Sequence, residues 1–219
     1  MKDEQTKLIF FDLDGTLTDG CEFVFGHVWD YFNLDHELSK KLIADFNAGR
    51  LSYEDWVKED IRIFKEAGVT RDEMIRSFGK IYVTKGAHEV LGVLKGENYK
   101  IFVVSGGIDL VIYHLFPHWQ EIFEDIFINK YIFDPQGSIA DAIPTPYDFE
   151  HKATCIRDMA KKYGVNIDQT VFVGDNHNDI HAAIAAGTSV AFNCKSDQLV
   201  QVATHHVESN DLRDILPYC

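Results

Sequence analysis

Acidic side chains follow two apolar segments that are typical of buried strands. Asp12 and Asp14 lie one residue apart after the run LIFF, and Asp175 and Asp179 follow the run TVFVG. Each pair alone has two interpretations. Asp12 and Asp14 could form an acidic turn, and Asp175 and Asp179 a helix cap, or either pair could belong to a site for phosphate chemistry. Several carboxylates in one place would repel one another without a cation, and oxygen ligands favour a hard ion such as Mg²⁺. The sequence therefore predicts a magnesium site if the two pairs meet.

Two further segments supply a hydroxyl group and an ammonium group. Ser105 and Gly106 end the apolar run KIFVV, and Lys152 opens the helical segment HKATCIRDMAKKYG. Taken alone, the serine and glycine are more typical of an ordinary strand-to-helix turn, and the lysine of a solvated surface. In a parallel sheet, however, the carboxyl ends of the strands meet at one edge. The conjunction of all these segments in this order favours a functional site.

The apolar runs also predict the fold class. Short, near-continuously apolar runs alternate with helical patterns, which is typical of a parallel sheet with helices on both faces. We therefore expect an α/β fold with a doubly wound parallel sheet. The expected strands cover residues 8–12, 100–107, 170–175 and 188–193.

Two segments interrupt this alternation. The segment after the first strand has no comparable apolar run, and it carries helix-start patterns at Ser52 and Thr70. Residues 126–143 contain Asp-Pro-Gln-Gly and are expected to form a β-hairpin annex. The domains that follow from this interpretation are an α/β core, residues 1–17 and 85–219, and a small helical cap inserted after the first strand, residues 18–84.

Composition and charge limit the class of protein. The chain has 219 residues and a formal net charge of −14, which is unfavourable for binding nucleic acid or a membrane surface. No apolar stretch approaches the ~20 residues of a membrane span, and the N-terminus lacks the pattern of a signal peptide. The four cysteines are widely spaced without a Cys-x-x-Cys pair. That spacing favours a cytoplasmic setting over a disulfide framework or a zinc ribbon.

Four short motifs, in order, resemble those of haloacid dehalogenase (HAD) type phosphatases. They are DLDGT, VVSGG, a lysine carried by a helix, and GDNHND. The resemblance covers nearly the whole chain and is strongest to the phosphoserine phosphatase branch of that family. It implies a HAD-like, Rossmann-type core and a Mg²⁺-dependent phosphatase activity that proceeds through an aspartyl-phosphate.

The resemblance also implies roles for the motif residues. Asp12 would be the nucleophile and Asp14 the general acid and base, while Lys152 and Mg²⁺ would cancel charge. Ser105 and the amide of Gly106 would hold the phosphoryl oxygens at a helix N-terminus. The implied metal contacts are Asp12, Asp14 through its backbone carbonyl, Asp175 and Asp179, the last of which could instead orient Lys152 or a metal-bound water. The implied secondary phosphate contacts are Thr16 and Asn178.

Substrate selection is expected to depend on the cap, where the sequence departs from the phosphoserine phosphatases. Those enzymes hold the substrate carboxylate with a cap arginine, and the corresponding position here is Asp60. The expected helix over residues 53–67 places Asp60 within an apolar stripe, so its side chain would either pair with a neighbour, reach solvent or line the substrate cavity. Those enzymes also use a glutamate just after the first motif, and its nearest counterpart here is Glu22.

An aspartate at that position disfavours a substrate carboxylate and favours an amine. We therefore expect a phosphomonoester other than phosphoserine, such as phosphoethanolamine or phosphocholine. Trp56, one helical turn from Asp60, would contact a quaternary ammonium group. If Arg50 anchors a carboxylate instead, the substrate is phosphoserine.

The combined prediction is a Mg²⁺-dependent phosphomonoester hydrolase that acts on a small phosphorylated metabolite, as a monomer or homodimer. One alternative is a phosphoserine phosphatase in the strict sense. The other is a phosphate- or ligand-binding protein of the same fold without turnover. Hydrolysis and transfer of the phosphoryl group to another alcohol use the same intermediate, so the sequence leaves both open.

Overall fold

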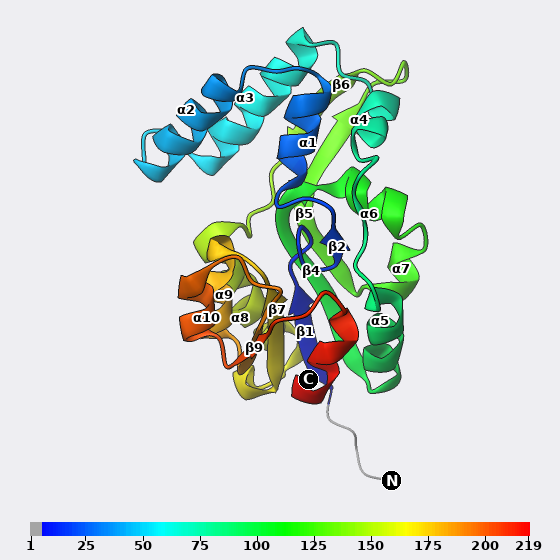
Figure 1. The fold of residues 1–219 in the computed structure, drawn as a ribbon, viewed down its shortest axis with the longest axis vertical. Helices are drawn as coiled ribbons and strands as arrows, with labels where there is room; N and C mark the ends of the chain where they lie inside the picture. Colours follow the sequence, from blue (N-terminus) through cyan, green and yellow to red (C-terminus); the bar gives the residue numbers. More distant parts are fainter. Residues whose placement is uncertain (1–5) are drawn as a thin grey trace.

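Seven strands form one sheet in the order β6-β5-β4-β1-β7-β8-β9 in the computed structural model, which describes residues 6–219 (Figure 1). Neighbouring strands are parallel except β5 and β6, which are antiparallel at one edge. The predicted doubly wound parallel sheet is confirmed. The predicted core also includes residues 1–5, which lie outside the part of the chain that the structure describes. The strands are β1 (Lys7–Phe11), β4 (Tyr99–Ile108), β5 (Asp125–Phe133), β6 (Ile139–Ile143), β7 (Thr170–Gly174), β8 (Thr188–Phe192) and β9 (His205–Val207).

Alternate residues of the central strand β1 face two different layers of helices. Leu8 and Phe10 pack in a core with α8, α9 and α10, whereas Ile9 and Phe11 pack in a core with α5, α6 and the 3₁₀ segment η4. All four side chains are fully buried, as expected for an apolar strand in a sheet that is covered on both faces. The helices beside the sheet are α5 (Ala87–Gly96), α6 (Asp109–Leu115), α7 (Trp119–Ile122), α8 (Lys152–Tyr163), α9 (Ile180–Ala185), α10 (Asp197–Val202) and η4 (Leu212–Tyr218).

Four helices follow the first motif and lie beyond the carboxyl end of β1 (Figure 1). Ser52 and Thr70 begin two of them as predicted, because each side chain accepts a hydrogen bond from a backbone N–H group of the first turn. A short antiparallel pair, β2 (Thr18–Asp19) and β3 (Tyr82–Val83), joins the two ends of this helical segment. The pair was not predicted, since two residues are too few to show the alternation of a strand. The helices are α1 (Val24–Tyr31), α2 (His36–Asn47), α3 (Tyr53–Glu66) and α4 (Arg71–Ser77).

The predicted β-hairpin is formed by β5 and β6, and it is also part of the main sheet. The first residues of β5 pair in parallel with β4, and its later residues pair with β6. The hairpin contacts the helical segment as well, because β6 packs against α3 and the N–H of Ile139 donates to the carbonyl oxygen of Val69. The expected domain division at residues 18–84 therefore stays a prediction.

Two further expectations concern the chain as a whole. Within residues 6–219, no helix combines the length and the apolar character that a membrane crossing requires. Cys21, Cys155, Cys194 and Cys219 are free thiols in this structure.

Candidate active site

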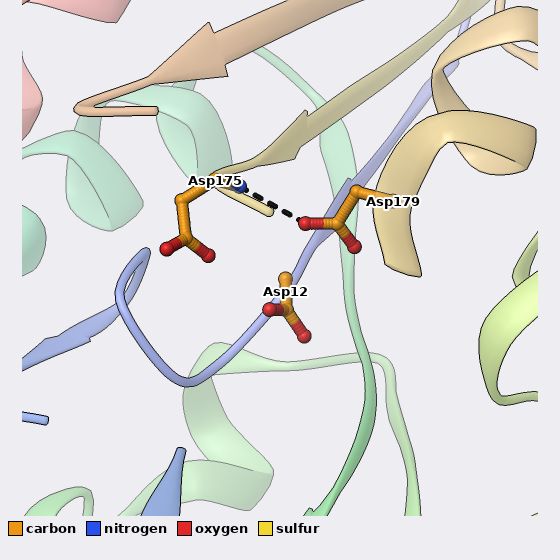
Figure 2. A group of neighbouring side chains, drawn as sticks. All are labelled: Asp12, Asp175 and Asp179. Carbon is orange, nitrogen blue, oxygen red and sulfur yellow. Dashed lines mark hydrogen bonds between the residues drawn. The ribbon is translucent and has the colours of Figure 1, made fainter. Parts of the chain in front are cut away.

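Three carboxylates converge at the carboxyl edge of the sheet (Figure 2). Asp12 follows β1, Asp175 follows the neighbouring strand β7, and Asp179 ends the 3₁₀ turn η3 (His177–Asp179). One oxygen of each carboxylate lies within 4.8 Å of the others, and all three side chains are buried. The parallel pairing of β1 and β7 brings together two motifs that are far apart in the sequence.

The ammonium group of Lys152 lies between two of these carboxylates. Its Nζ is 2.8 Å from Oδ1 of Asp12 and 2.7 Å from Oδ1 of Asp179, and the residue is 0% exposed. A buried ammonium ion is strongly unfavourable without such partners. Although burial opposes its charge, the carboxylates of Asp12 and Asp179 raise the pKa of Lys152. The lysine therefore stays protonated.

Both oxygens of Asp179 are engaged by the protein itself. Oδ1 accepts from Lys152, and Oδ2 accepts from the backbone N–H groups of Asp175 and Asn176 at 2.9 and 3.2 Å. Figure 2 shows the bond to Asp175, which fixes the loop after β7. This geometry supports an orienting role for Asp179, on the lysine and on the loop, more strongly than direct contact with a metal.

Asp12 and Asp175 supply oxygen donors that fit a hard divalent cation. Burial raises the pKa of Asp12 and of Asp175, and the charges of Asp12 and Asp179 raise the pKa of Asp175 further. Nζ of Lys195 lies 2.6 Å from Oδ2 of Asp175 and offsets part of the negative charge. The donors are oxygen atoms of buried carboxylates that repel one another, which is a set suited to a hard cation.

Asp14 lies beside the cluster, and the surroundings of its carboxyl group suit it to proton transfer. Its Oδ2 accepts from the backbone N–H of Val24 at 2.8 Å, whereas its buried Oδ1 has no hydrogen-bond partner within residues 6–219. Burial raises the pKa of Asp14 to about 7, and the charge of Asp12 adds to the effect. A carboxyl group with such a pKa can give and accept a proton near neutral pH.

Ser105 and Gly106 lie near the end of β4, the other strand that pairs with β1. Oγ of Ser105 accepts from the N–H of Gly107 at 3.1 Å. Gly106 lies against Asp148 so closely that a Cβ atom at this position would be 2.0 Å from Oδ2 of that carboxylate. Only glycine therefore fits there without displacing the aspartate.

The segment of residues 105–108 does not form the helix N-terminus that was expected at Ser105 and Gly106. α6 begins at Asp109, and extended backbone continues to Ile108 with a register shift after Val104. Phosphoryl oxygens at Ser105 and Gly106 would therefore meet the hydroxyl and the loop amides rather than the first turn of a helix.

A buried asparagine connects this loop to the helical segment. Nδ2 of Asn129 donates to the carbonyl oxygen of Gly106 at 2.7 Å and to the hydroxyl of Tyr53 on α3 at 2.8 Å. Its Oδ1 accepts from the backbone N–H of Thr145 at 2.8 Å. Because Asn129 is 1% exposed, these bonds are shielded from water and fix α3 relative to the loop.

A cavity of about 500 Å³ extends from the carboxylates to the helical segment. Asp12, Asp14 and Ser105 form part of its wall, and α3 contributes the side chains of Trp56 and Asp60. A concave site of this size, lined by apolar side chains with a few polar groups, is typical of small-molecule binding. The arrangement can hold a phosphate group against a nucleophile, a lysine and a proton donor.

The chain can be assigned to a family on this basis. A model of the haloacid dehalogenase-like hydrolases matches residues 6–187. The chain belongs to this family.

This haloacid dehalogenase-like hydrolase is similar over its whole length to phosphoserine phosphatases. The phosphoserine phosphatase of Methanocaldococcus jannaschii is 28% identical across 99% of both chains. That of Lactococcus lactis is 22% identical across 96% of this chain and 94% of its own. A solved structure described as a phospho-aspartyl intermediate analogue of phosphoserine phosphatase gives a TM-score of 0.77 at 28% identity, covering 98% of this chain and 99% of that one. The predicted resemblance to this branch is confirmed.

Eight of the thirteen predicted site residues line the cavity, and five do not. Lys152, Asp175 and Asp179 belong to the buried acidic cluster, and the other two are Thr16 and Arg50. Oγ1 of Thr16 donates to Oδ1 of Asp175 at 3.4 Å, so it contacts the acidic cluster instead of the cavity. Arg50 is exposed and pairs with Asp45 at 2.7 Å, and the structure does not bring it to the cavity. The predicted residues that do line the cavity include Glu22, Trp56, Asp60, Gly106 and Asn178.

Asp60 is buried on the inner face of α3, as the predicted apolar stripe required. It is 4% exposed and lines the cavity, and its Oδ1 has no hydrogen-bond partner in the described chain. Burial raises the pKa of Asp60 to about 8, with a smaller contribution from Glu59. The charge of Asp60 in turn adds to the raised pKa of Tyr131, whose buried hydroxyl also lacks a partner within residues 6–219. Of the three alternatives for Asp60, the structure favours a position in the cavity wall without an ion-pair partner.

The sequence did not reveal several residues of the site. Lys195 follows β8 by three residues, so the rule that strand ends converge could have identified it. Asp148, Asn129 and Tyr53 belong to no motif. Only the folded chain brings Asp148 and Asn129 to Gly106, and Tyr53 to Asn129.

The asparagine bridge leads to a first prediction. Asn129→Leu should lower kcat/KM for a phosphomonoester by about 10- to 100-fold, because the loop that carries Ser105 loses its anchor. Tyr53→Phe is the control, since it removes the bond to α3 and keeps the bond to Gly106, and it should cost less than about tenfold. Steady-state kinetics measures the loss of activity, and a urea titration measures the loss of stability, so the two can be compared for each variant. Wild-type kcat/KM with lower stability alone would contradict the positioning role.

The burial of Asp60 gives a second prediction, on stability. The pKa of Asp60 is higher in the folded protein than in the unfolded chain, so folding is favoured at pH 4 and this advantage is lost as pH rises towards 8. Asparagine does not titrate, so Asp60→Asn should match the wild type near pH 4.

The same variant should be more stable than the wild type by on the order of 2–4 kcal/mol near pH 8, as measured by urea unfolding of the metal-free protein. The exposed, matched variant Glu54→Gln should differ from the wild type by less than about 0.5 kcal/mol at both pH values. An effect of Asp60→Asn that did not change with pH would disprove the explanation.

Proposed function

We propose that this hydrolase is a Mg²⁺-dependent phosphomonoesterase in which Asp12 is the nucleophile. The observation that carries the proposal is the buried group of Asp12, Lys152 and Asp179, with Asp14 at its side and the cavity in front. The similarity to phosphoserine phosphatases across the whole chain supports it. The substrate is a small phosphorylated metabolite.

In the first step a carboxylate oxygen of Asp12 attacks phosphorus, and the bond from phosphorus to the alcohol oxygen breaks. Lys152 holds Oδ1 of Asp12 and cancels part of the charge that accumulates around the phosphoryl group. Asp14 in its protonated form donates its proton to the departing alcohol oxygen, which its pKa of about 7 allows. The products of this step are the free alcohol and an aspartyl-phosphate.

In the second step a water molecule attacks the aspartyl-phosphate. Asp14 is now ionised and accepts the proton of that water, so the same group serves as acid and then as base. Phosphate leaves and Asp12 is restored. The walls of the cavity exclude other water from the intermediate.

The proposed metal ligands are Asp12, Asp175 and the backbone carbonyl of Asp14, and Asp179 orients Lys152. Bound Mg²⁺ would supply positive charge opposite the phosphoryl oxygens. The ammonium group of Lys195 offsets negative charge on Oδ2 of Asp175. Ser105 and the amide of Gly106 bind the phosphoryl group from the side of β4.

A phosphoserine phosphatase in the strict sense is the second candidate, because the relatives carry that name. The placement of Arg50 and Asp60 does not favour it, since neither supplies a cation for a substrate carboxylate. The free cysteines support a cytoplasmic setting, and the assembly proposed is a monomer or homodimer.

Replacement of the nucleophile tests the central step. Asp12→Asn should lower kcat for p-nitrophenyl phosphate by at least about a thousandfold, because an amide cannot form the aspartyl-phosphate. The outcome is read from phosphate release and from mass spectrometry of protein quenched with acid, which should carry an added phosphate at Asp12 in the wild type only. Full Mg²⁺-dependent activity of the variant would refute the assignment.

Removal of metal tests the cofactor. After EDTA treatment and buffer exchange, activity should fall by at least about a hundredfold, because the phosphate anion would then face several uncompensated carboxylates. Added Mg²⁺ should restore it. Full activity in the presence of excess chelator would exclude the metal from the reaction.

A further inference from the structure

The cavity wall beyond Asp12 and Asp14 carries acidic side chains and no permanent positive charge. Glu22, Asp30, Asp60 and Asp148 line it, whereas no lysine or arginine within residues 6–219 does. A substrate carboxylate would lose its water shell there without gaining an ion-pair partner. This charge distribution disfavours an anionic alcohol and favours a cationic one.

Among these four acids, Asp60 is the one without a partner. Glu22 accepts from Nδ2 of Asn176 at 3.1 Å, Asp30 pairs with His36 at 2.9 Å, and Oδ1 of Asp148 accepts from the N–H of Phe149 at 2.8 Å. Asp60 is 4% exposed, and its Oδ1 accepts no hydrogen bond from the described chain. A buried carboxylate in this condition is unfavourable until a donor or a cation approaches it.

Aromatic rings from two parts of the chain line the same cavity. Tyr53 and Trp56 share the inner face of α3 with Asp60, and the ring of Phe149 lies 6.4 Å from each of these two rings. The cation–π contacts within residues 6–219 involve other rings, those of Tyr99 and Tyr163. The faces of the cavity rings are therefore free of protein cations, and aromatic faces attract ammonium groups.

The backbone of Phe149 supports a functional use of this ring. Its φ is +47°, in the left-handed region, which is unfavourable for a bulky side chain. The ring lies 4.9 Å from that of Phe46 on α2 and beside the cavity. Strain of this kind persists where the surrounding structure enforces it, and it is concentrated at functional sites.

We propose that the alcohol part of the substrate carries an ammonium group, which binds between the carboxylate of Asp60 and the rings of Trp56 and Phe149 while the phosphate lies at Asp12. The proposal rests on the phosphatase function and narrows its substrates to phosphomonoesters of amino alcohols that have no carboxylate. An alcohol of the same shape without the charge leaves Asp60 unpaired.

A matched pair of substrates isolates the charge. Phosphocholine and 3,3-dimethylbutyl phosphate have the same shape, but only the first carries a positive charge. In the wild type, kcat/KM for phosphocholine should exceed that for the neutral ester by at least about tenfold. Phosphoethanolamine shows whether a primary ammonium group is accepted equally well, and phosphoserine adds a carboxylate to that group.

Variants connect the selectivity to the proposed residues. Asp60→Asn should reduce the preference for phosphocholine to within about threefold of unity, and Trp56→Leu should reduce it by about threefold. Glu54→Gln removes an exposed charge from the same helix and should leave the preference unchanged. If either variant is unstable, the other one provides the comparison.

The outcomes separate this proposal from the phosphatase function. Hydrolysis of p-nitrophenyl phosphate with equal kcat/KM for the matched pair, or a preference for phosphoserine, would overturn the proposal and leave the function intact. Calorimetry of substrate binding to the Asp12→Asn variant provides a second test, which does not require turnover. Phosphocholine should bind at least about tenfold more tightly than the neutral ester, and equal affinities would overturn the proposal even if no ester is hydrolysed.

Discussion

The burial of one lysine is the constraint on which the site depends. Lys152 is 0% exposed, so its charge must be matched by carboxylates, and these come from the end of β1 and from the turn after β7. The first residue of α8 is thereby tied to two strands of the sheet. Loss of the lysine would leave two buried carboxylates without their shared counter-charge, so the lysine holds three distant segments in one geometry.

A second polar group, Asn129, relates the helical segment to this centre. It lies on β5, the strand that continues from the sheet into the hairpin, and its amide reaches both Gly106 and the hydroxyl of Tyr53. Through this one side chain the core fixes both the segment around Gly106 and α3. This arrangement gives the cavity a defined shape between the carboxylates of Asp12 and Asp14 and the inner face of α3.

Burial gives two carboxyl groups in this cavity raised pKa values, and their surroundings give them different uses. Asp14 accepts a backbone hydrogen bond and lies beside the proposed nucleophile Asp12, where a pKa of about 7 suits proton transfer. Asp60 lies among apolar and aromatic side chains of α3 without a hydrogen bond to Oδ1, and we propose that it binds a cation. In this proposal the core supplies the reacting groups and α3 supplies the group that selects the substrate.

The sequence by itself determined the sheet, the motif residues and the inner position of Asp60. Those features depend on local patterns: apolar runs bury strands on both faces, strand ends converge at one edge, and a period of 3.6 residues defines the face of α3. Tertiary structure alone decided that Arg50 pairs with Asp45 outside the cavity and that Asp148 and Asn129 meet Gly106. The physical reason is that these contacts join segments with no periodic relation, so their partners are set by packing. The loop at Gly106 shows the same limit, because the position of the next helix depends on a register shift in β4 that no local pattern records.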